Sequence, residues 1–184
     1  MFKFLIILLI FNFFNSAFSS TNENIISQLK TIKNLSFNFI QTIDDKKEKG
    51  NCIILYPKKM FCEYNGPKKK IIVSNGKSVA IKTAIKGGYY LYPLSKTPLQ
   101  FLLDKDYLIS QIKTLKPKTV NNKYLNFKLL QKESEINIFF NKNNNQLVGW
   151  QTEDIYQNLS ITYISNIEVN KKIDNRKFIL PENN

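Results

Sequence analysis

Short stretches typical of β-strands make up most of the chain, and the first has the alternation of hydrophobic and polar residues that marks a half-buried strand. The stretch 35–43 shows it clearly, because Leu35, Phe37 and Phe39 are separated by Ser36 and Asn38. Further strands are predicted at 50–56, 60–64, 70–74, 78–82 and 89–92 and, after one interruption, at 107–115, 124–131, 135–141, 147–152, 159–169 and 177–180. Turn residues such as Asn75-Gly76 separate neighbouring stretches and favour antiparallel hairpins.

Two segments have helical spacing instead. The first is amphipathic, has Thr21 or Asn24 as an expected N-cap, and carries its apolar residues at Ile25, Ile26, Leu29 and Ile32. The second begins at Thr97-Pro98-Leu99-Gln100, which has the pattern of a capping box, and continues through the apolar residues 101–103. It is expected to end near Asp104–Asp106.

The predicted fold class is mostly β (α+β), a large antiparallel sheet of about 10–11 strands with two short helices. A sheet of this size must curl or pack against another layer. The helices are too short to cover a whole face, yet each has an apolar stripe. We therefore expect an open, curved half-barrel lidded by short helices, which leaves an apolar cavity suited to a lipid or another hydrophobic ligand.

The first twenty residues have the layout of a secretory signal peptide. Lys3 precedes an apolar run from Phe4 to Phe14, and small residues follow at Ala17 and Ser19. The run has about eleven residues, whereas a membrane-spanning helix needs about 20. We expect cleavage after Ser19, so that residues 1–19 are the signal peptide and 20–184 the exported domain, with no lipid-anchoring cysteine after the apolar run.

The cysteines, Cys52 and Cys62, would enter an oxidising compartment. They lie on the two arms of a predicted hairpin around Tyr56–Lys59. Cross-strand cysteines form a disulfide only when the register places them opposite each other. The sequence leaves open whether they are bridged or are two buried thiols.

Composition excludes several kinds of chemistry. The chain has no histidine, so no His-based triad or His-ligated metal can form, and two cysteines cannot make a four-ligand zinc site. The net charge is +13, and of the 27 lysines and arginines only Arg176 is an arginine. The densest basic runs are Lys46–Lys49, interrupted by Glu48, and Lys68–Lys70. Because the lysines are spread along the chain, a solvated surface is favoured over a nucleic-acid interface, although anionic membrane headgroups would also attract it.

Seven segments of the chain, in order, resemble the outer-membrane lipoprotein carrier family, a group of LolA-like periplasmic chaperones. They are Phe39–Gln41, Tyr56–Tyr64, Ile72–Lys77, Tyr92–Leu103, Leu147–Gln151, Ile173–Asp174 and Phe178. None of these motifs is specific alone, but the ordered set covers essentially the whole exported chain. The resemblance agrees with the signal peptide.

The resemblance implies a half-barrel that holds the acyl chains of lipoproteins and makes or breaks no bond. Its members take cargo from an inner-membrane ATP-driven transporter and pass it to an outer-membrane acceptor. We therefore expect a monomeric periplasmic carrier with acylated lipoproteins as partners, and with no catalytic residue, cofactor, metal or nucleic acid. Shielding acyl chains from water, at about 0.8 kcal/mol per methylene, supplies the driving force.

By position in the family pattern, the expected lipid-binding cavity is lined by residues from the first strand, the hairpin and both helices. They are Leu29, Ile32, Phe37, Phe39, Tyr64, Leu99, Leu102 and Leu103. Each could instead be ordinary core, and the sequence does not say which strand face is concave. The chain departs from the family at Tyr56 and Phe61, where arginines are common. An arginine before the motif's proline is thought to latch the lid, so Tyr56 would make a weaker latch because a hydroxyl has fewer donors.

Two other functions remain open. A protein of the same fold could sense lipid or lipoprotein in the periplasm and signal through a partner protein. It would bind cargo without releasing it from membranes. An envelope hydrolase acting on lipid would need a Ser-Lys or carboxylate mechanism, since histidine is absent.

Overall fold

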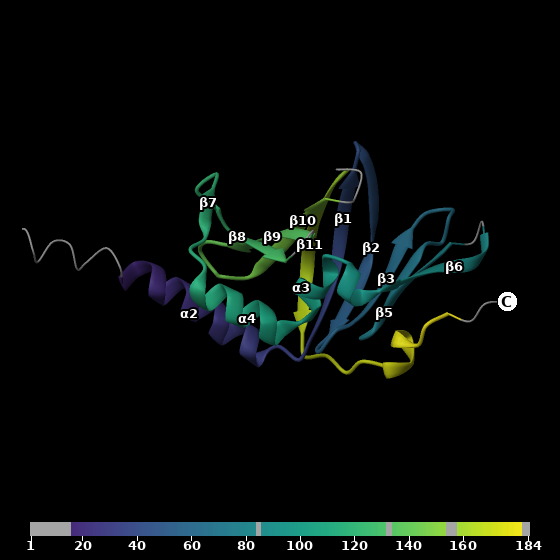
Figure 1. Ribbon diagram of the computed structural model, residues 1–184, viewed down its shortest axis with the longest axis horizontal. Helices are drawn as coiled ribbons and strands as arrows, with labels where there is room; N and C mark the ends of the chain where they lie inside the picture. Colours follow the sequence, from purple (N-terminus) through teal and green to yellow (C-terminus); the bar gives the residue numbers. More distant parts are fainter. Residues whose placement is uncertain (1–15, 84–85, 132–133, 154–157, 182–184) are drawn as a thin grey trace, which may run out of the picture.

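The computed structural model describes residues 16–83, 86–131, 134–153 and 158–181. Within them, eleven strands form one antiparallel sheet in the order β6-β5-β4-β3-β2-β1-β11-β10-β9-β8-β7 (Figure 1). The strands are β1 (Asn34–Ile43), β2 (Lys46–Leu55), β3 (Lys59–Asn65), β4 (Ile71–Asn75), β5 (Ser78–Thr83), β6 (Lys86–Pro93), β7 (Lys118–Val120), β8 (Tyr124–Gln131), β9 (Ser134–Asn141), β10 (Leu147–Glu153) and β11 (Leu159–Val169). The predicted open, mostly β fold is confirmed.

The sheet consists of two successive series of hairpins, β1–β6 and β7–β11, that lie side by side. Strands β1–β6 and β7–β11 each follow one another in space as in sequence, and β1 pairs with β11 to join them. The sheet is curved and open (Figure 1). Along β1, Leu35, Phe37 and Phe39 are buried on the inner face, whereas Asn38 and Ile40 are exposed on the outer face. The alternation along β1 therefore determines which of its side chains enter the core.

The helices lie on the inner side of the sheet (Figure 1). They are α2 (Ser16–Thr31), α3 (Leu99–Leu103) and α4 (Lys105–Thr114), with a 3₁₀ turn η1 (Leu94–Lys96) before α3. The predicted N-caps Thr21 and Asn24 are wrong, because α2 begins at Ser16 and both residues lie inside it. The predicted boundary at residue 19 stays a prediction, and residues 1–15 lie outside the described ranges.

The predicted strand at 107–115 is wrong, because this segment is the helix α4. Leu108 and Ile112, four residues apart, are both buried, and Asp104 caps the helix by accepting a hydrogen bond from the Tyr107 N–H at 3.1 Å. The predicted capping box is also wrong. Thr97 donates its hydroxyl to the Leu94 carbonyl instead, and α3 starts at Leu99 with Pro98 before it.

The predicted strand at 177–180 is wrong as well. It is replaced by the 3₁₀ turn η2 (Asn175–Phe178) and an extended tail, and Asp174 caps η2 through the Arg176 N–H. A further strand needs a free sheet edge, and β11 is already paired on both sides. Phe178 is instead buried against the outer face of β3 and β4. In the described part of the chain, no helix is long and apolar enough to cross a membrane.

Candidate functional site: a helix-covered apolar face

The inner face of the sheet is apolar across both series of hairpins. Every second residue of the central strands points to it, which is what the two-residue period of a strand dictates. The fully or nearly fully buried residues are Leu35, Phe37 and Phe39 of β1, Cys52 and Ile54 of β2, Met60 and Cys62 of β3, Leu125, Phe127 and Leu129 of β8, Ile136, Ile138 and Phe140 of β9, Trp150 of β10 and Ile164 of β11.

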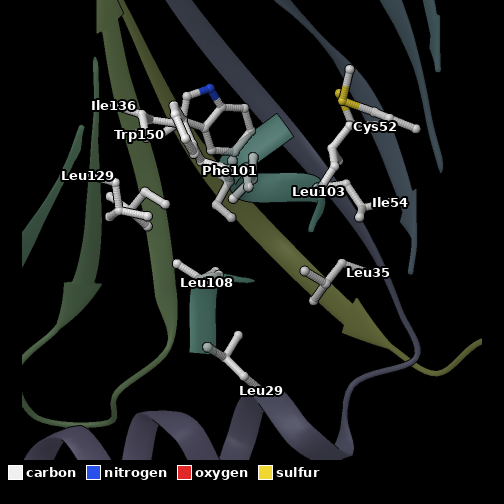
Figure 2. Packing of buried hydrophobic residues seen from close by; sticks show 14 of the residues in the cluster. Leu29, Leu35, Cys52, Ile54, Phe101, Leu103, Leu108, Leu129, Ile136 and Trp150 are labelled. Atoms are coloured by element: carbon white, nitrogen blue, oxygen red, sulfur yellow. The ribbon is translucent and has the colours of Figure 1, made fainter. Parts of the chain in front are cut away.

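The three helices cover this face with apolar residues of their own. Figure 2 shows Leu29, Phe101, Leu103 and Leu108 packed toward Leu35, Leu129, Ile136 and Trp150 of the strands. Helix α3 contributes three consecutive buried residues, Phe101, Leu102 and Leu103, although it is only five residues long. The helices therefore cover the inner face of the sheet (Figure 2), and we call them the lid.

All eight residues expected to line a lipid cavity belong to this one cluster. Leu29, Phe37, Phe39, Leu102 and Leu103 are buried, and Ile32, Tyr64 and Leu99 are partly buried against them. The structure thus brings the expected residues together. Whether acyl chains replace the lid in contacting them stays a prediction.

A small apolar cavity of about 270 Å³ remains beside the end of α2. On one side it is lined by Leu29 of α2 and Ile32 just after that helix. On the other side it is lined by Phe140, Leu147 and Ile167 on the inner faces of β9, β10 and β11. Pockets for small ligands usually have at least about 300 Å³. This cavity lies just below that range. The alternation in 135–141 contained the signal for Phe140. Ile167 could not be found in this way, because alternation groups it with the exposed Ile161 and Tyr163, and a register shift in β11 turns it inward.

The two longer lid helices run antiparallel, and each satisfies the carbonyls at the end of the other. The Asn22 side chain of α2 donates to the Ile112 and Leu115 carbonyls at the end of α4, at 2.7 and 2.9 Å. In return, Lys105 Nζ at the start of α4 donates to the Ile32 carbonyl, just past the end of α2, at 2.8 Å. The last four carbonyls of a helix lack partners within it and attract cations. These reciprocal contacts join α2 and α4 into one unit.

Tyr56, the predicted latch, lies where this unit meets the sheet. Its backbone N–H donates to the Lys33 carbonyl at 3.1 Å, and Lys105 Nζ lies 5.4 Å from the centre of its ring. Burial raises the pKa of the Tyr56 hydroxyl far above its usual range. At this end of the two helices, the side-chain hydrogen bond between them comes from Lys105, and Tyr56 contributes its ring face. Sequence reasoning missed Lys105 because nothing local indicates that it reaches the end of α2.

Lys58, two residues after Tyr56, attaches the same turn to α3 and α4. Its N–H donates to the Leu103 carbonyl at 2.9 Å, and its ammonium lies 3.0 Å from Asp104 Oδ2. The Ser74 hydroxyl donates to the Lys58 carbonyl at 2.7 Å, which holds the turn against β4. We call the turn Tyr56–Lys58, with Ile32, Lys105 and Asp104, the latch end of the molecule.

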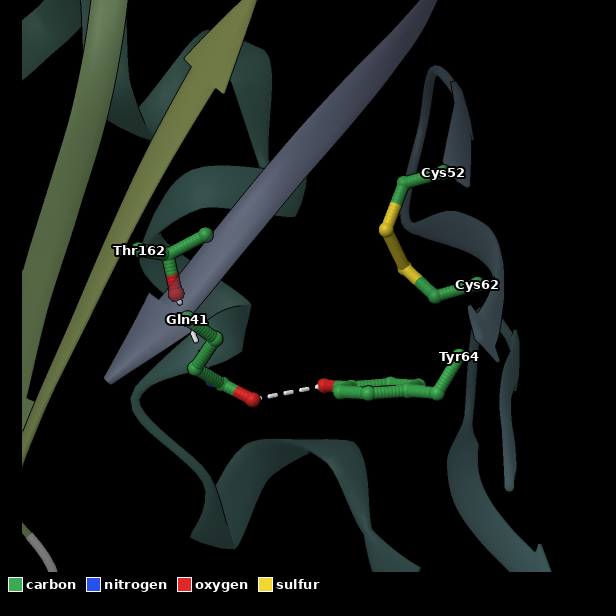
Figure 3. The surroundings of a disulfide bond; sticks show 5 residues. All are labelled: Gln41, Cys52, Cys62, Tyr64 and Thr162. Carbon is green, nitrogen blue, oxygen red and sulfur yellow. Dashed lines mark hydrogen bonds between the residues drawn. A yellow bond between two sulfur atoms is a disulfide. The ribbon is translucent and has the colours of Figure 1, made fainter. Parts of the chain in front are cut away.

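A polar network borders the apolar face at the other end of the strands (Figure 3). The Tyr64 hydroxyl donates to Gln41 Oε1 at 2.8 Å, and Gln41 Nε2 donates to Ser160 Oγ at 3.0 Å and Thr162 Oγ1 at 3.3 Å. Burial, and then the charge of Glu48, raise the pKa of Tyr64 far above its usual range. The Tyr64 ring packs edge-on against Phe39, with ring centres 4.8 Å apart.

Cys52 and Cys62 are direct cross-strand partners on β2 and β3 and form a disulfide on the inner face (Figure 3). The question that the sequence left open is thus answered by the register. In the described ranges, no group of three or more His, Cys, Asp or Glu side chains is placed to hold a metal ion. The site is therefore an apolar surface covered by helices that polar contacts hold in place.

Residues 30–180 match the family described as outer membrane lipoprotein carrier protein LolA. The chain belongs to the LolA family. No curated protein matches the sequence. Among solved structures, an uncharacterized conserved protein from Thermus thermophilus has 6 % identity and a TM-score of 0.51, over 87 % of this chain and 94 % of that one. This likeness shows the fold alone.

Two other solved structures are less similar to this LolA family chain. The LolA superfamily protein NE2245 from Nitrosomonas europaea has 8 % identity and a TM-score of 0.47, over 85 % of this chain and 96 % of that one. MucB, in the MucA/MucB complex from Pseudomonas aeruginosa, has 6 % identity and a TM-score of 0.42, over 90 % of this chain and 62 % of that one.

Proposed function

We propose that this LolA family member is a periplasmic carrier that binds the acyl chains of lipoproteins and delivers them from the inner to the outer membrane. The observation that carries the proposal is the apolar inner face covered by a lid that polar contacts hold at its ends. The Cys52–Cys62 disulfide agrees with an oxidising compartment. Binding and delivery need no catalytic group, and we propose none.

The lid explains how such a carrier stays in solution without cargo. An open apolar face of this extent would aggregate, so the empty protein buries it under Leu29, Phe101 and Leu103. Acyl chains would replace these helix contacts with contacts of the same chemistry. The exchange leaves a small net free energy, which suits cargo that must later be released.

The proposed carrier function also implies the partners. An inner-membrane ATP-driven transporter would supply the energy to extract the lipoprotein, and an outer-membrane acceptor would receive it. The protein itself would act as a monomer, because the sheet and lid complete one core within a single chain.

A release experiment tests the proposal. The exported protein is added to spheroplasts that carry a labelled outer-membrane lipoprotein, and label in the soluble fraction is measured. We expect release as a one-to-one complex, and no label in the soluble fraction when the exported protein is omitted. Binding of a hydrophobic fluorescent probe without any release of lipoprotein would contradict the carrier function and favour a sensor of the same fold.

A further inference from the structure

The two densest lysine runs of the sequence meet at one end of the sheet. The first run, Lys46–Lys49, forms the start of β2. The second, Lys68–Lys70, lies in the loop between β3 and β4. Together they border an open hollow of about 410 Å³. It is lined by Lys47, Glu48, Lys49, Tyr64, Asn65, Gly66, Pro67, Lys68, Lys69 and Lys70. We call this region the lysine end.

The charges of the hollow are unbalanced, with five lysines and one glutamate. Glu48 pairs with Lys70, whose ammonium also lies 3.7 Å from the centre of the Tyr64 ring. The other four lysines form no ion pair within the part of the chain that the structure describes. Asp44 and Asp45, at the tip of the β1–β2 hairpin, do not line the hollow. The region therefore has a local excess of positive charge.

An exposed apolar stripe lies beside these lysines on the outer face. Tyr163, Ile40, Lys49 and Asn65 form one cross-strand row over β11, β1, β2 and β3. In this row Ile40 is 39 % and Tyr163 51 % exposed, and Ile161, the next outward residue of β11, is 43 % exposed. Lysines next to exposed aliphatic and tyrosine side chains are the composition of surfaces that lie in a membrane interface.

We infer that the lysine end, with the stripe Ile40–Ile161–Tyr163, docks the protein on a phospholipid bilayer that contains anionic headgroups. Lysines near an anionic surface are attracted to it, and the stripe adds apolar area that headgroups can cover. The inference rests on the proposed function, because a carrier collects and delivers cargo at membranes. A docked protein would have its apolar interior close to the bilayer, since Tyr64 of the hollow packs on Phe39 of the inner face.

The test is sedimentation of the exported protein with vesicles of phosphatidylglycerol mixed with phosphatidylcholine, and with vesicles of phosphatidylcholine alone. The variant is K47E/K49E/K68E/K69E. The matched control, K113E/K116E/K118E/K123E, changes the net charge equally at four exposed lysines on α4, β7 and their flanking turns. Thermal unfolding checks that both variants keep the fold.

We expect the wild-type protein to bind the anionic vesicles and to lose binding as salt is added. Each lysine contributes about a fivefold factor near such a surface, so the lysine-end variant, with four lysines replaced, should lose on the order of a hundredfold or more in partitioning, and the control variant about threefold or less. Tyr163→Ser should weaken binding without changing its salt dependence. Equal losses in both charge variants, or no preference of the wild-type protein for anionic vesicles, would overturn the inference. These vesicles hold no lipoprotein, so either result leaves the release experiment to judge the carrier function separately.

Discussion

The latch end and the lysine end use the same residue type in opposite ways. At the latch end, the ammonium of Lys105 bonds to the Ile32 carbonyl and that of Lys58 to Asp104. At the lysine end, Lys47, Lys49, Lys68 and Lys69 have no ion-pair partner among the described residues. Because lysine is nearly the sole cation of this chain, its effect depends on what the fold places opposite it. Paired lysines hold the lid, and unpaired ones leave a positive surface.

The largest expected difference between the ends comes from apolar packing under the latch. Leu103 is fully buried, and Lys58 bonds to its carbonyl. Leu103→Ala should lower the free energy of unfolding by about 2–5 kcal/mol through loss of contacts and a cavity. Leu130→Ala is the matched control, because that side chain is 62 % exposed and should cost about 0.5 kcal/mol or less. Urea unfolding measures both, and equal losses would mean that the lid does not pack as described.

Removing the ammonium that caps α2 tests the latch directly. Lys105→Ala should lower the free energy of unfolding by about 1–2 kcal/mol, because the Ile32 carbonyl loses a charged donor. The same variant should bind a hydrophobic fluorescent probe faster, since the lid opens more often. Lys113→Ala, at an exposed position of the same helix, should change neither quantity appreciably. Probe binding that is the same in both variants would show that Lys105 does not hold the lid.

Tyr56→Arg distinguishes a latch at residue 56 from one at Lys105. A guanidinium there would face the ammonium of Lys105, which lies 5.4 Å from the present ring centre. We expect a loss of about 1 kcal/mol from like-charge repulsion, and a smaller loss when Lys105→Ala is also present. A double-mutant cycle on the free energy of unfolding measures this coupling. Additive effects, or a more stable Tyr56→Arg protein, would contradict the assignment.

The buried tyrosines make both ends sensitive to alkali. The pKa values of Tyr56 and Tyr64 are raised in the folded protein, so the unfolded chain ionises first as pH rises. Their contribution to stability is complete below about pH 10 and falls as pH rises beyond it. Tyr56→Phe and Tyr64→Phe should each flatten that fall in urea unfolding. Tyr163→Phe, at an exposed tyrosine, should not. A slope that neither of the first two variants changes would refute this explanation.

Reversing a single surface charge is expected to change the free energy of unfolding least. Lys58→Glu places like charges beside Asp104 and should cost up to about 1 kcal/mol, reduced by solvent because the Lys58 side chain is 45 % exposed. Lys68→Glu should be neutral within about 0.5 kcal/mol. Added salt should shrink the difference between the two variants. A larger loss from Lys68→Glu would mean that the lysine end has a structural role.

The fold could be predicted from the sequence where local periodicity and a turn to the next strand along the chain are enough to define a strand. Alternation located β1 and placed Phe37 and Phe39 on one face, and turn residues such as Asn75-Gly76 located the hairpins that follow. The prediction failed at α4, where a strand was expected at 107–115 but Leu108 and Ile112 pack with helical spacing. It also failed at 177–180, because availability of a sheet edge is decided by strands far away in sequence.

The site was less predictable because its contacts join distant segments. Resemblance to a family pointed to Tyr56, but Lys105 reaches the end of α2 across 73 residues of sequence. Likewise, Lys46–Lys49 and Lys68–Lys70 are separate runs in the sequence, and only the pairing of β2 with β3 brings them to one hollow. Lysines of both kinds look alike in the sequence, since their partners depend on the tertiary fold.

The central claim, that acyl chains occupy the inner face under the lid, is tested most directly by photo-crosslinking in the purified complex with lipoprotein. A photoreactive phenylalanine analogue replaces Phe39 on the inner face or Tyr163 on the outer face, both in β-strands that pair with each other. We predict crosslinks to acylated lipoprotein from position 39 and none from position 163, with no crosslink at 39 to cargo that lacks acyl chains. Crosslinks from position 163 alone, or equal crosslinking of cargo without acyl chains, would contradict the account.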